Sequence, residues 1–136
     1  MKPEGINRMA INGCKKGKAG ERELSHALNG LLGTSCRRGQ QHTGLEGKDV
    51  VGLDGIHIEC KRVEKLNLDK AVQQSVRDAS AEDVPAVFHR RNRQPWLVTV
   101  RLDDAVSFAE RILENKAAGD SEALAHMFLN NQFTEE

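Results

Sequence analysis

Residues 49–63, DVVGLDGIHIECKRV, contain two short runs of β-forming residues separated by a turn signal. The runs cover 49–52 and 55–63, and the pair Asp54-Gly55 between them favours a hairpin turn. We therefore predict two adjacent antiparallel strands at the centre of the chain.

Side chains alternate between the two faces of a strand. In the second predicted strand, His57, Glu59 and Lys61 are therefore expected on one face, and the apolar residues between them on the other. The carboxylate of Glu59 and the ammonium of Lys61 should point the same way.

Upstream of this hairpin, apolar residues recur at helical spacing over 18–32, and Gly33 supplies a stop. We expect a first helix there, followed by a short strand within 34–38. The glycine-rich, polar segment 39–47 is expected to be a mobile loop that leads directly into Asp49.

Downstream, Asn67 is expected to cap a helix with one apolar stripe. Residues 84–88 and 96–100 are typical of two antiparallel strands joined by a basic turn. Trp96 at the start of the last strand is expected in the core or at a dimer interface, more than as a platform for a base.

The last clear helix is expected to begin at Asp103 or Asp104 and to end at Leu113. Its inward side chains are predicted to be Val106, Ala109, Ile112 and Leu113. Residues 117–120 resemble a linker to a short acidic helix around 121–128.

The order helix, three strands, helix, two strands, helix predicts an α/β fold with a mixed central sheet of about five strands flanked by helices. We divide the chain into a basic arm (1–16), a single domain with one core (17–116) and an acidic C-terminal helix or tail (117–136).

The net charge is zero, but the charges are unevenly distributed. Lys and Arg are in excess over 1–48 and 89–101, whereas Asp and Glu are in excess over 49–88 and 102–136. Basic segments around an acidic centre suit a metal-dependent enzyme that acts on a polyanion, although solvated surface charge gives the same pattern.

Three cysteines with no CxxC spacing and no clustered histidine indicate neither a disulfide framework nor a zinc site. The sequence has no run as long as a membrane span, and its start lacks the apolar stretch of a signal peptide. We expect a cytoplasmic protein that does not contact a membrane.

Asp49, Glu59 and Lys61 form the arrangement with the clearest chemistry. Mg²⁺ prefers oxygen ligands and usually takes one or two carboxylates, which Asp49 and Glu59 can supply. A nearby lysine can orient the attacking water or stabilise the developing anion. Glu21 on the first helix is a candidate for a further carboxylate or a second ion. In a chain with 29% charged residues the short motif also arises by chance.

With Gly17-Lys18-Ala19-Gly20-Glu21-Arg22-Glu23 before it, the motif resembles the PD-(D/E)xK nuclease superfamily. Within that superfamily it is similar to archaeal-type Holliday-junction resolvases and their small phage-encoded relatives. The resemblance covers roughly 15–113, and Lys48 stands where the motif's proline would be. The acidic tail after Lys116 has no counterpart that we can place.

The resemblance implies a restriction-endonuclease-like fold and a role for each matching residue. Asp49 and Glu59 look like ligands of Mg²⁺, with Mn²⁺ as a substitute, and Lys61 looks like the catalytic lysine. Glu21 looks like the first-helix acid, which is a further metal ligand, and Glu23 like its non-catalytic neighbour. Either Gln73 or Gln74 resembles a glutamine that often lies near the lysine.

Several basic side chains are candidates for DNA phosphate contacts, although solubility alone would also explain them. These are Lys15, Lys16, Lys18, Arg37, Arg38, Lys48, Arg90, Arg91 and Arg93. His42 is left out of the metal site, and the partner of His57 stays open.

These observations favour a metal-dependent endonuclease selective for branched DNA, with a Holliday-junction resolvase as the first hypothesis. Symmetric cutting of a four-way junction needs two active sites, so a homodimer is implied. Two alternatives stay open: a nicking or restriction-type nuclease on linear duplex, and a non-catalytic DNA-binding module of the same fold.

Overall fold

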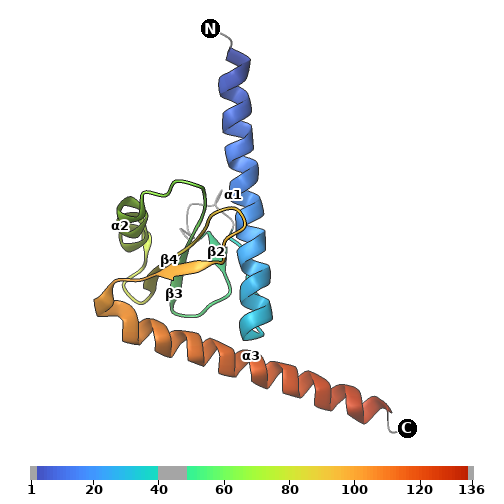
Figure 1. Ribbon diagram of the computed structural model, residues 1–136. Coiled ribbons are helices and arrows are strands. Elements are labelled where there is room, and N and C mark those ends of the chain that lie inside the picture. Colours follow the sequence, from blue (N-terminus) through green and yellow to red (C-terminus); the bar gives the residue numbers. More distant parts are fainter. Residues whose placement is uncertain (1–2, 40–48, 135–136) are drawn as a thin grey trace.

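A five-stranded mixed sheet lies between helices in the computed structural model (Figure 1). The structure describes residues 3–39 and 49–134, and the side chains of 17–39 and 49–131. In chain order the elements are α1 (Pro3–Leu32), β1 (Arg37–Arg38), β2 (Val50–Val51), β3 (Ile56–Arg62), α2 (Leu68–Asp78), β4 (Val84–Arg90), β5 (Leu97–Thr99), a 3-10 turn (Leu102–Asp104) and α3 (Ala105–Thr134). The predicted fold class is confirmed.

The strands lie in the order β1-β2-β3-β4-β5. The predicted hairpin is confirmed, because β2 and β3 pair antiparallel with Val50 opposite Ile58. Strand β4 runs parallel to β3, with α2 as the connection between them, and β5 returns antiparallel to β4. Gly55 at the hairpin turn has φ +77°, a conformation that glycine adopts without the cost of a Cβ atom.

Helices α1 and α2 pack on opposite faces of β3. A Cβ atom on Gly20 of α1 would lie 2.6 Å from the Cβ of Arg62, so α1 covers the face with Cys60 and Arg62. Gln74 of α2 bonds to Lys61, so α2 covers the face with Glu59 and Lys61. The cap of α2 is confirmed, since the side chain of Asn67 accepts from the Lys70 N–H.

One apolar core fills the space between α1, the sheet and the start of α3. Its buried side chains include Leu24, Leu28, Leu32, Val50, Ile56, Ile58, Ala86 and Phe88. Phe108 and Ile112 of α3 pack against this cluster, and so does Trp96, in agreement with its expected place in the core. Helices α1 and α3 therefore cover the same apolar face of the central strands, opposite the face that α2 covers.

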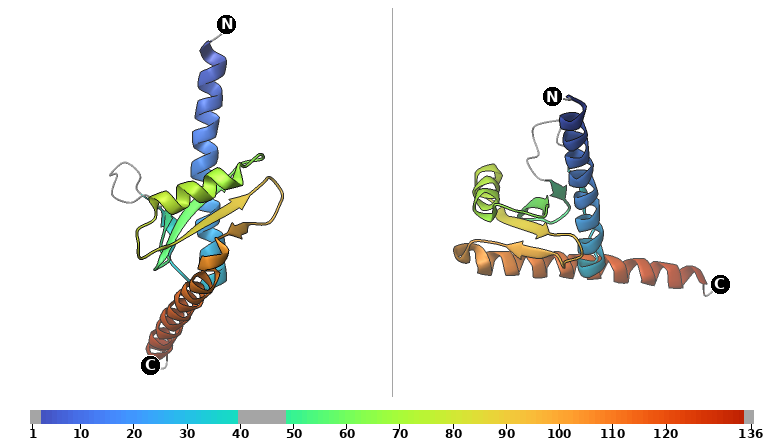
Figure 2. Two further views of the ribbon diagram at one scale, coloured as in Figure 1. Left: turned by 90° about the vertical axis from the view of Figure 1, so that its left-hand side faces the viewer. Right: turned by 45° about the horizontal axis from the view of Figure 1, so that its top comes forward.

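Both outer helices differ from the prediction. Helix α1 starts at Pro3 instead of 18, and α3 continues without a break through 117–120, where we expected a linker (Figures 1 and 2). Two features keep α3 helical there. Lys116 and Asp120 form an i,i+4 ion pair, and Gly119 packs directly against Gly33 at the end of α1. The division into arm, domain and tail stays a prediction.

The predicted inward face of α3 was largely wrong. Val106 and Leu113 are 71% and 66% exposed, and Ala109 is exposed as well. Only Ile112 faces the core as predicted, together with Phe108, whose ring lies 6.3 Å from that of Phe88. The packing of the Phe108 ring on Phe88 and the close approach of Gly119 to the end of α1 determine which face of α3 points to the core.

Candidate active site

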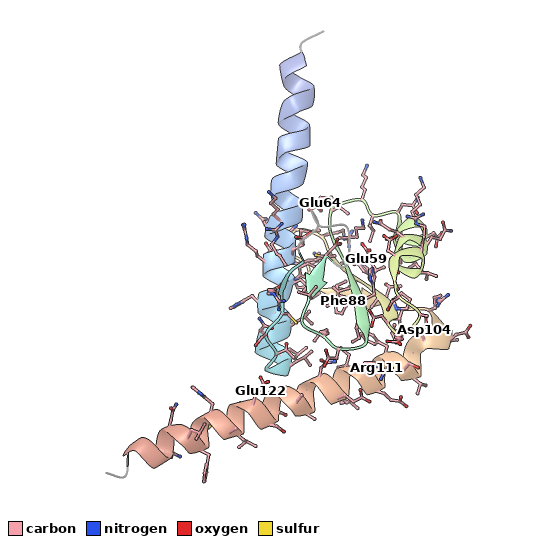
Figure 3. The ribbon with its side chains drawn as sticks, turned by 180° about the vertical axis from the view of Figure 1, so that it is seen from behind. Glu59, Glu64, Phe88, Asp104, Arg111 and Glu122 are labelled. Atoms are coloured by element: carbon pink, nitrogen blue, oxygen red, sulfur yellow. The ribbon has the colours of Figure 1, made fainter. Side chains whose placement is uncertain are left out.

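Glu59 is the most deeply buried acidic side chain among the described residues, with 1% of its surface exposed. It projects from β3 into the interior of the domain (Figure 3). One carboxylate oxygen, Oε1, lies 3.0 Å from Nε2 of His57, which is also buried. The other, Oε2, has no hydrogen-bond partner among the described residues. Burying an unpaired charged oxygen is costly, so this atom calls for a proton or a cation.

Asp49 stands beside Glu59 at the start of β2. Its Oδ2 accepts a hydrogen bond of 2.9 Å from the Cys60 N–H, and its own N–H donates to Ile58 O at 3.1 Å. The pKa of Asp49 is raised to about 7, and burial is the largest cause. The hydrogen bond from the Cys60 N–H lowers the pKa, whereas the charge of Glu59, a side-chain hydrogen bond with Glu59 and the charge of Glu21 raise it. Two acidic groups are therefore held close together in a site of low polarity.

This pair fits a divalent cation better than a structural role. Like charges at close range destabilise each other, and Mg²⁺ would offset both while taking one or two carboxylates as ligands. Among the described residues, no group of three or more histidine, cysteine, aspartate or glutamate side chains is arranged to hold a metal ion. Asp49 and Glu59 would thus leave the remaining positions to water and substrate.

Glu21 of α1 is also buried. Its Oε2 accepts a 2.7 Å hydrogen bond from Nε of Arg38, one of the arginines expected to contact DNA. The charge of Glu21 also contributes to the raised pKa of Asp49. The predicted role of Glu21 as a further ligand stays a prediction.

Lys61 lies two residues beyond Glu59 on the same face of β3. Its ammonium donates a 3.1 Å hydrogen bond to Oε1 of Gln74 on α2. Gln73 is exposed. Of the two glutamines that the sequence leaves open, Gln74 is therefore the one that contacts the lysine.

We predict that Gln74→Ala slows metal-dependent DNA cleavage by roughly 10- to 100-fold, as expected for loss of a group that orients a site residue. Gln73→Ala, on the neighbouring exposed position, should leave the rate within about twofold. Rates of nicking under single-turnover conditions measure both. Equal rates for the two variants would remove Gln74 from the site.

Glu23 holds two arginines on the α1 side of the sheet. Its Oε2 accepts from Nε of Arg62 at 3.0 Å and from Arg90 at 3.2 Å. Arg90 also donates 2.7 Å to the Gln94 carbonyl. Glu23 therefore links α1 to β3 and β4 through two ion pairs, and the guanidinium of Arg90 already has protein partners. The non-catalytic role of Glu23 stays a prediction.

Cys60 lies between Glu59 and Lys61 in sequence, and its thiol is poorly suited to act as a nucleophile. The pKa of its thiol is raised to about 12, mainly by burial and also by the carboxylates of Asp49, Glu21 and Glu23, while Lys61 lowers it. Because the thiolate is the reactive form, this cysteine stays inert near neutral pH.

Four of the basic side chains expected to contact DNA are exposed: Lys18, Arg37, Arg91 and Arg93. Arg91 and Arg93 lie on the β4–β5 turn, where Arg93 adopts φ 60°. Lys48 and His42 lie outside the described residues, and so do the side chains of Lys15 and Lys16. The predicted DNA contacts stay predictions.

Residues 12–122 match the model of a family described as "Phage putative PDDEXK endonuclease". The chain belongs to this family. No curated protein and no solved structure matches it. The matched range contains all of Glu21, Asp49, Glu59 and Lys61, and it confirms the superfamily that the motif indicated. Membership in an endonuclease family supports a nuclease with DNA as its substrate.

Among the described helices, none is long and apolar enough to cross a membrane.

The raised pKa of Asp49, about 7 against an ordinary 3.8, predicts how stability depends on pH without metal. Between pH 4 and 7 the folded protein keeps a proton that the unfolded chain has released. The free energy of unfolding should therefore fall as pH rises, by on the order of 1 kcal/mol for each pH unit. Urea unfolding in EDTA at several pH values measures this fall.

Asp49→Asn is the control, because it removes the titrating group and keeps the shape. The fall should be absent from the variant, and in the native protein Mg²⁺ should reverse it at pH 7.5. If the free energy of unfolding depended on pH in the same way in both proteins, Asp49 would not be the titrating group.

Proposed function

We propose that this protein is a metal-dependent, structure-selective DNA endonuclease, and specifically a Holliday-junction resolvase that uses Mg²⁺, with Mn²⁺ as a substitute. The metal-dependent part is supported by the two buried carboxyl groups of Glu59 and Asp49, because Oε2 of Glu59 accepts no hydrogen bond from a donor group of the described residues. The preference for branched DNA rests on the resemblance of the motif to resolvases.

In this mechanism Asp49 and Glu59 hold the cation, and His57 fixes the carboxylate of Glu59 through its 3.0 Å contact. A metal ion bound there would supply an activated water molecule and offset charge on the phosphate. Lys61, positioned by Gln74, orients the attacking water or stabilises the anion that develops on the phosphate. Exposed arginines on the β4–β5 turn would hold the DNA backbone.

The deciding experiment incubates the protein with a labelled four-way junction and with linear duplex of the same sequence, in Mg²⁺, Mn²⁺ or EDTA. A resolvase should place paired, symmetric nicks near the crossover, only with metal. Equal cutting of linear duplex would replace this proposal with a nicking or restriction-type nuclease. Metal-independent binding without any cutting would indicate a non-catalytic DNA-binding module.

A homodimer belongs to the same proposal, and α3 offers a surface for it. Val106, Leu113, Leu124 and Phe128 are separated by close to whole numbers of helical turns and are 64–71% exposed. They lie on the side of α3 opposite the residues that contact the domain. Exposed apolar stripes of this kind mark sites of association, and α3 extends well beyond the sheet (Figure 2).

We predict that the double variant Leu124→Glu/Phe128→Glu is monomeric and no longer cuts both strands of a junction in one binding event. Light scattering gives the mass, and a supercoiled cruciform plasmid shows whether cuts are paired. The control, Ala125→Glu/Leu129→Glu, changes the same turns of α3 on another face and should remain dimeric. Two variants of equal mass would contradict the placement of the interface.

A further inference from the structure

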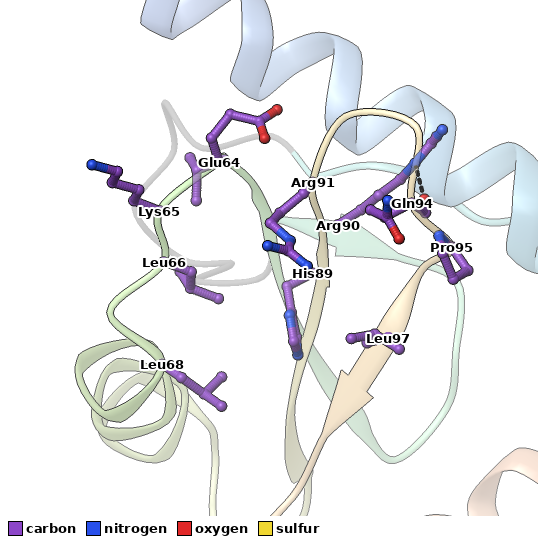
Figure 4. Close-up of a pocket in the computed structure, with 11 residues that line it drawn as sticks. Glu64, Lys65, Leu66, Leu68, His89, Arg90, Arg91, Gln94, Pro95 and Leu97 are labelled. Atoms are coloured by element: carbon purple, nitrogen blue, oxygen red, sulfur yellow. Dashed lines mark hydrogen bonds between the residues drawn. The ribbon is translucent and has the colours of Figure 1, made fainter.

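A pocket of about 540 Å³ lies next to the candidate active site and has no part in the mechanism above (Figure 4). It is bounded by the connection from β3 to α2 on one side and by the β4–β5 hairpin on the other. Leu68 and Leu97 point toward each other across it, and His89 lies between them. Its volume is within the range of about 300–1,000 Å³ that small ligands occupy.

Strand register places this pocket on the catalytic face of the sheet. His89 of β4 pairs with Lys61 of β3, and Leu97 of β5 pairs with His89. Paired residues of neighbouring strands share a face, and strands are about 4.8 Å apart. The pocket therefore starts roughly one strand spacing from Lys61, and Leu97 lies about two spacings away.

The chemistry of the walls suits a nucleobase. Leu66, Leu68, Pro95 and Leu97 give apolar surface, while His89 and Arg91 add planar groups on which bases can stack. Leu97 is 57% exposed and Leu68 37% exposed, so a ligand would remove both from water.

The rim of the pocket is basic. It carries Lys65 and Arg91 against one acid, Glu64, whose Oε1 accepts a hydrogen bond from the Asn92 N–H. Arg90 also lines the pocket, but its guanidinium is paired with Glu23. Phosphates on either side of a bound base would therefore meet positive charge.

We infer that this pocket binds one unpaired, unstacked nucleotide of the DNA substrate, within about one to three nucleotides of the phosphate that is cut. The inference rests on the proposed nuclease function and names the substrate feature that this site recognises. Stacked nucleotides of a duplex rise about 3.4 Å each, which matches the separation between Lys61 and the pocket. A base inside an intact duplex cannot enter, so the pocket favours DNA that has an unpaired position.

The test compares two duplexes of equal sequence, one fully paired and one with a single unpaired 2-aminopurine. Affinities are measured in EDTA, where no cleavage proceeds. Leu97→Glu places a carboxylate in the pocket, and Val98→Glu places the same charge on the opposite face of the same strand. Val98 is 43% exposed, so both changes fall on accessible positions.

Leu97→Glu should weaken binding of the bulged duplex about tenfold or more, the scale of one lost base contact, and abolish the change in 2-aminopurine emission. It should leave the paired duplex unchanged, and Val98→Glu should match the native protein on both. Leu68→Glu, from the opposite wall, should reproduce the effect of Leu97→Glu. Equal affinity of Leu97→Glu and Val98→Glu for the bulged duplex would overturn the inference.

The experiments distinguish an error in the inference about the pocket from an error in the proposed nuclease function. A native protein that binds the bulge through Leu97 but cuts no DNA in Mg²⁺ supports the pocket and refutes the proposed nuclease. A native protein that cuts DNA but binds the bulge independently of Leu97 refutes the pocket alone.

Discussion

Glu59→Gln should abolish DNA cleavage and, at the same time, stabilise the metal-free protein. Glu59 is 1% exposed, and its Oε2 lacks a partner among the described residues. Glutamine keeps the shape but removes the buried charge beside Asp49. We expect a gain of about 1–3 kcal/mol in the free energy of unfolding, the usual cost of an unsatisfied buried polar group.

The same substitution removes a metal ligand, and the loss of several kcal/mol of transition-state stabilisation corresponds to a fall in rate of about 1,000-fold or more. Single-turnover cleavage in Mg²⁺ and urea unfolding in EDTA measure the two effects separately. Opposite changes in activity and stability are typical of a residue retained for function.

Glu23→Gln is the matched control. Glu23 accepts hydrogen bonds from Arg62 and Arg90 and has no contact with the proposed metal site. It should lose about 1 kcal/mol of stability and keep its cleavage rate. If Glu59→Gln instead lost stability as Glu23→Gln does, Glu59 would be a structural residue and the proposed centre would be wrong.

The local elements could be predicted because their signals lie within a few residues of each other. The Asp54-Gly55 turn and the β-forming runs beside it specify the hairpin, and Asn67 specifies the start of α2. Strand alternation also placed His57 and Glu59 on one face, which made their 3.0 Å contact foreseeable. Strand alternation does not exclude a partner for His57 on a neighbouring strand, so the sequence alone does not specify the contact between His57 and Glu59.

Choices between neighbouring residues depended on tertiary packing. Gln73 and Gln74 are equivalent by sequence, and only the rotation of α2 against β3 brings Gln74 to Lys61. Similarly, Gly17 opens the family motif but has open space around it, whereas Gly20 is the position where α1 meets β3. The expected roles of Glu21, Asp49 and Glu59 came from the family resemblance, because no local sequence pattern indicates what an acidic residue does.

The course of α3 could not be predicted, because the reason for it lies elsewhere in the chain. Residues 117–120 contain two alanines, a glycine and an aspartate, which suit a linker as well as a helix. The decisive contact is between Gly119 and the end of α1, about 85 residues upstream. Glycine in a helix interior is usually unfavourable, so its presence here indicates close packing instead of a helix end.

Gly119→Ala is therefore expected to detach α3 from α1. A Cβ atom at this position would lie 2.5 Å from the Leu32 carbonyl oxygen and 2.6 Å from that of Gly33, both backbone atoms that cannot rotate away. Despite the better helix propensity of alanine, we expect a loss of about 2–3 kcal/mol. Gly30→Ala is the matched control, because Gly30 lies in α1 with open space around it. It should gain up to about 1 kcal/mol.

Detachment of α3 should also change the geometry of the candidate active site. Asn115, one turn before Gly119, accepts from the Asp54 N–H at 2.9 Å and donates to the Asp54 carbonyl at 3.1 Å. These bonds hold the turn between β2 and β3. Asp49 directly precedes β2, and Glu59 lies in the middle of β3. Gly119→Ala should therefore lower metal-dependent cleavage even well below its melting temperature. Full cleavage by a folded but destabilised variant would mean that the β2–β3 turn keeps its geometry without α3.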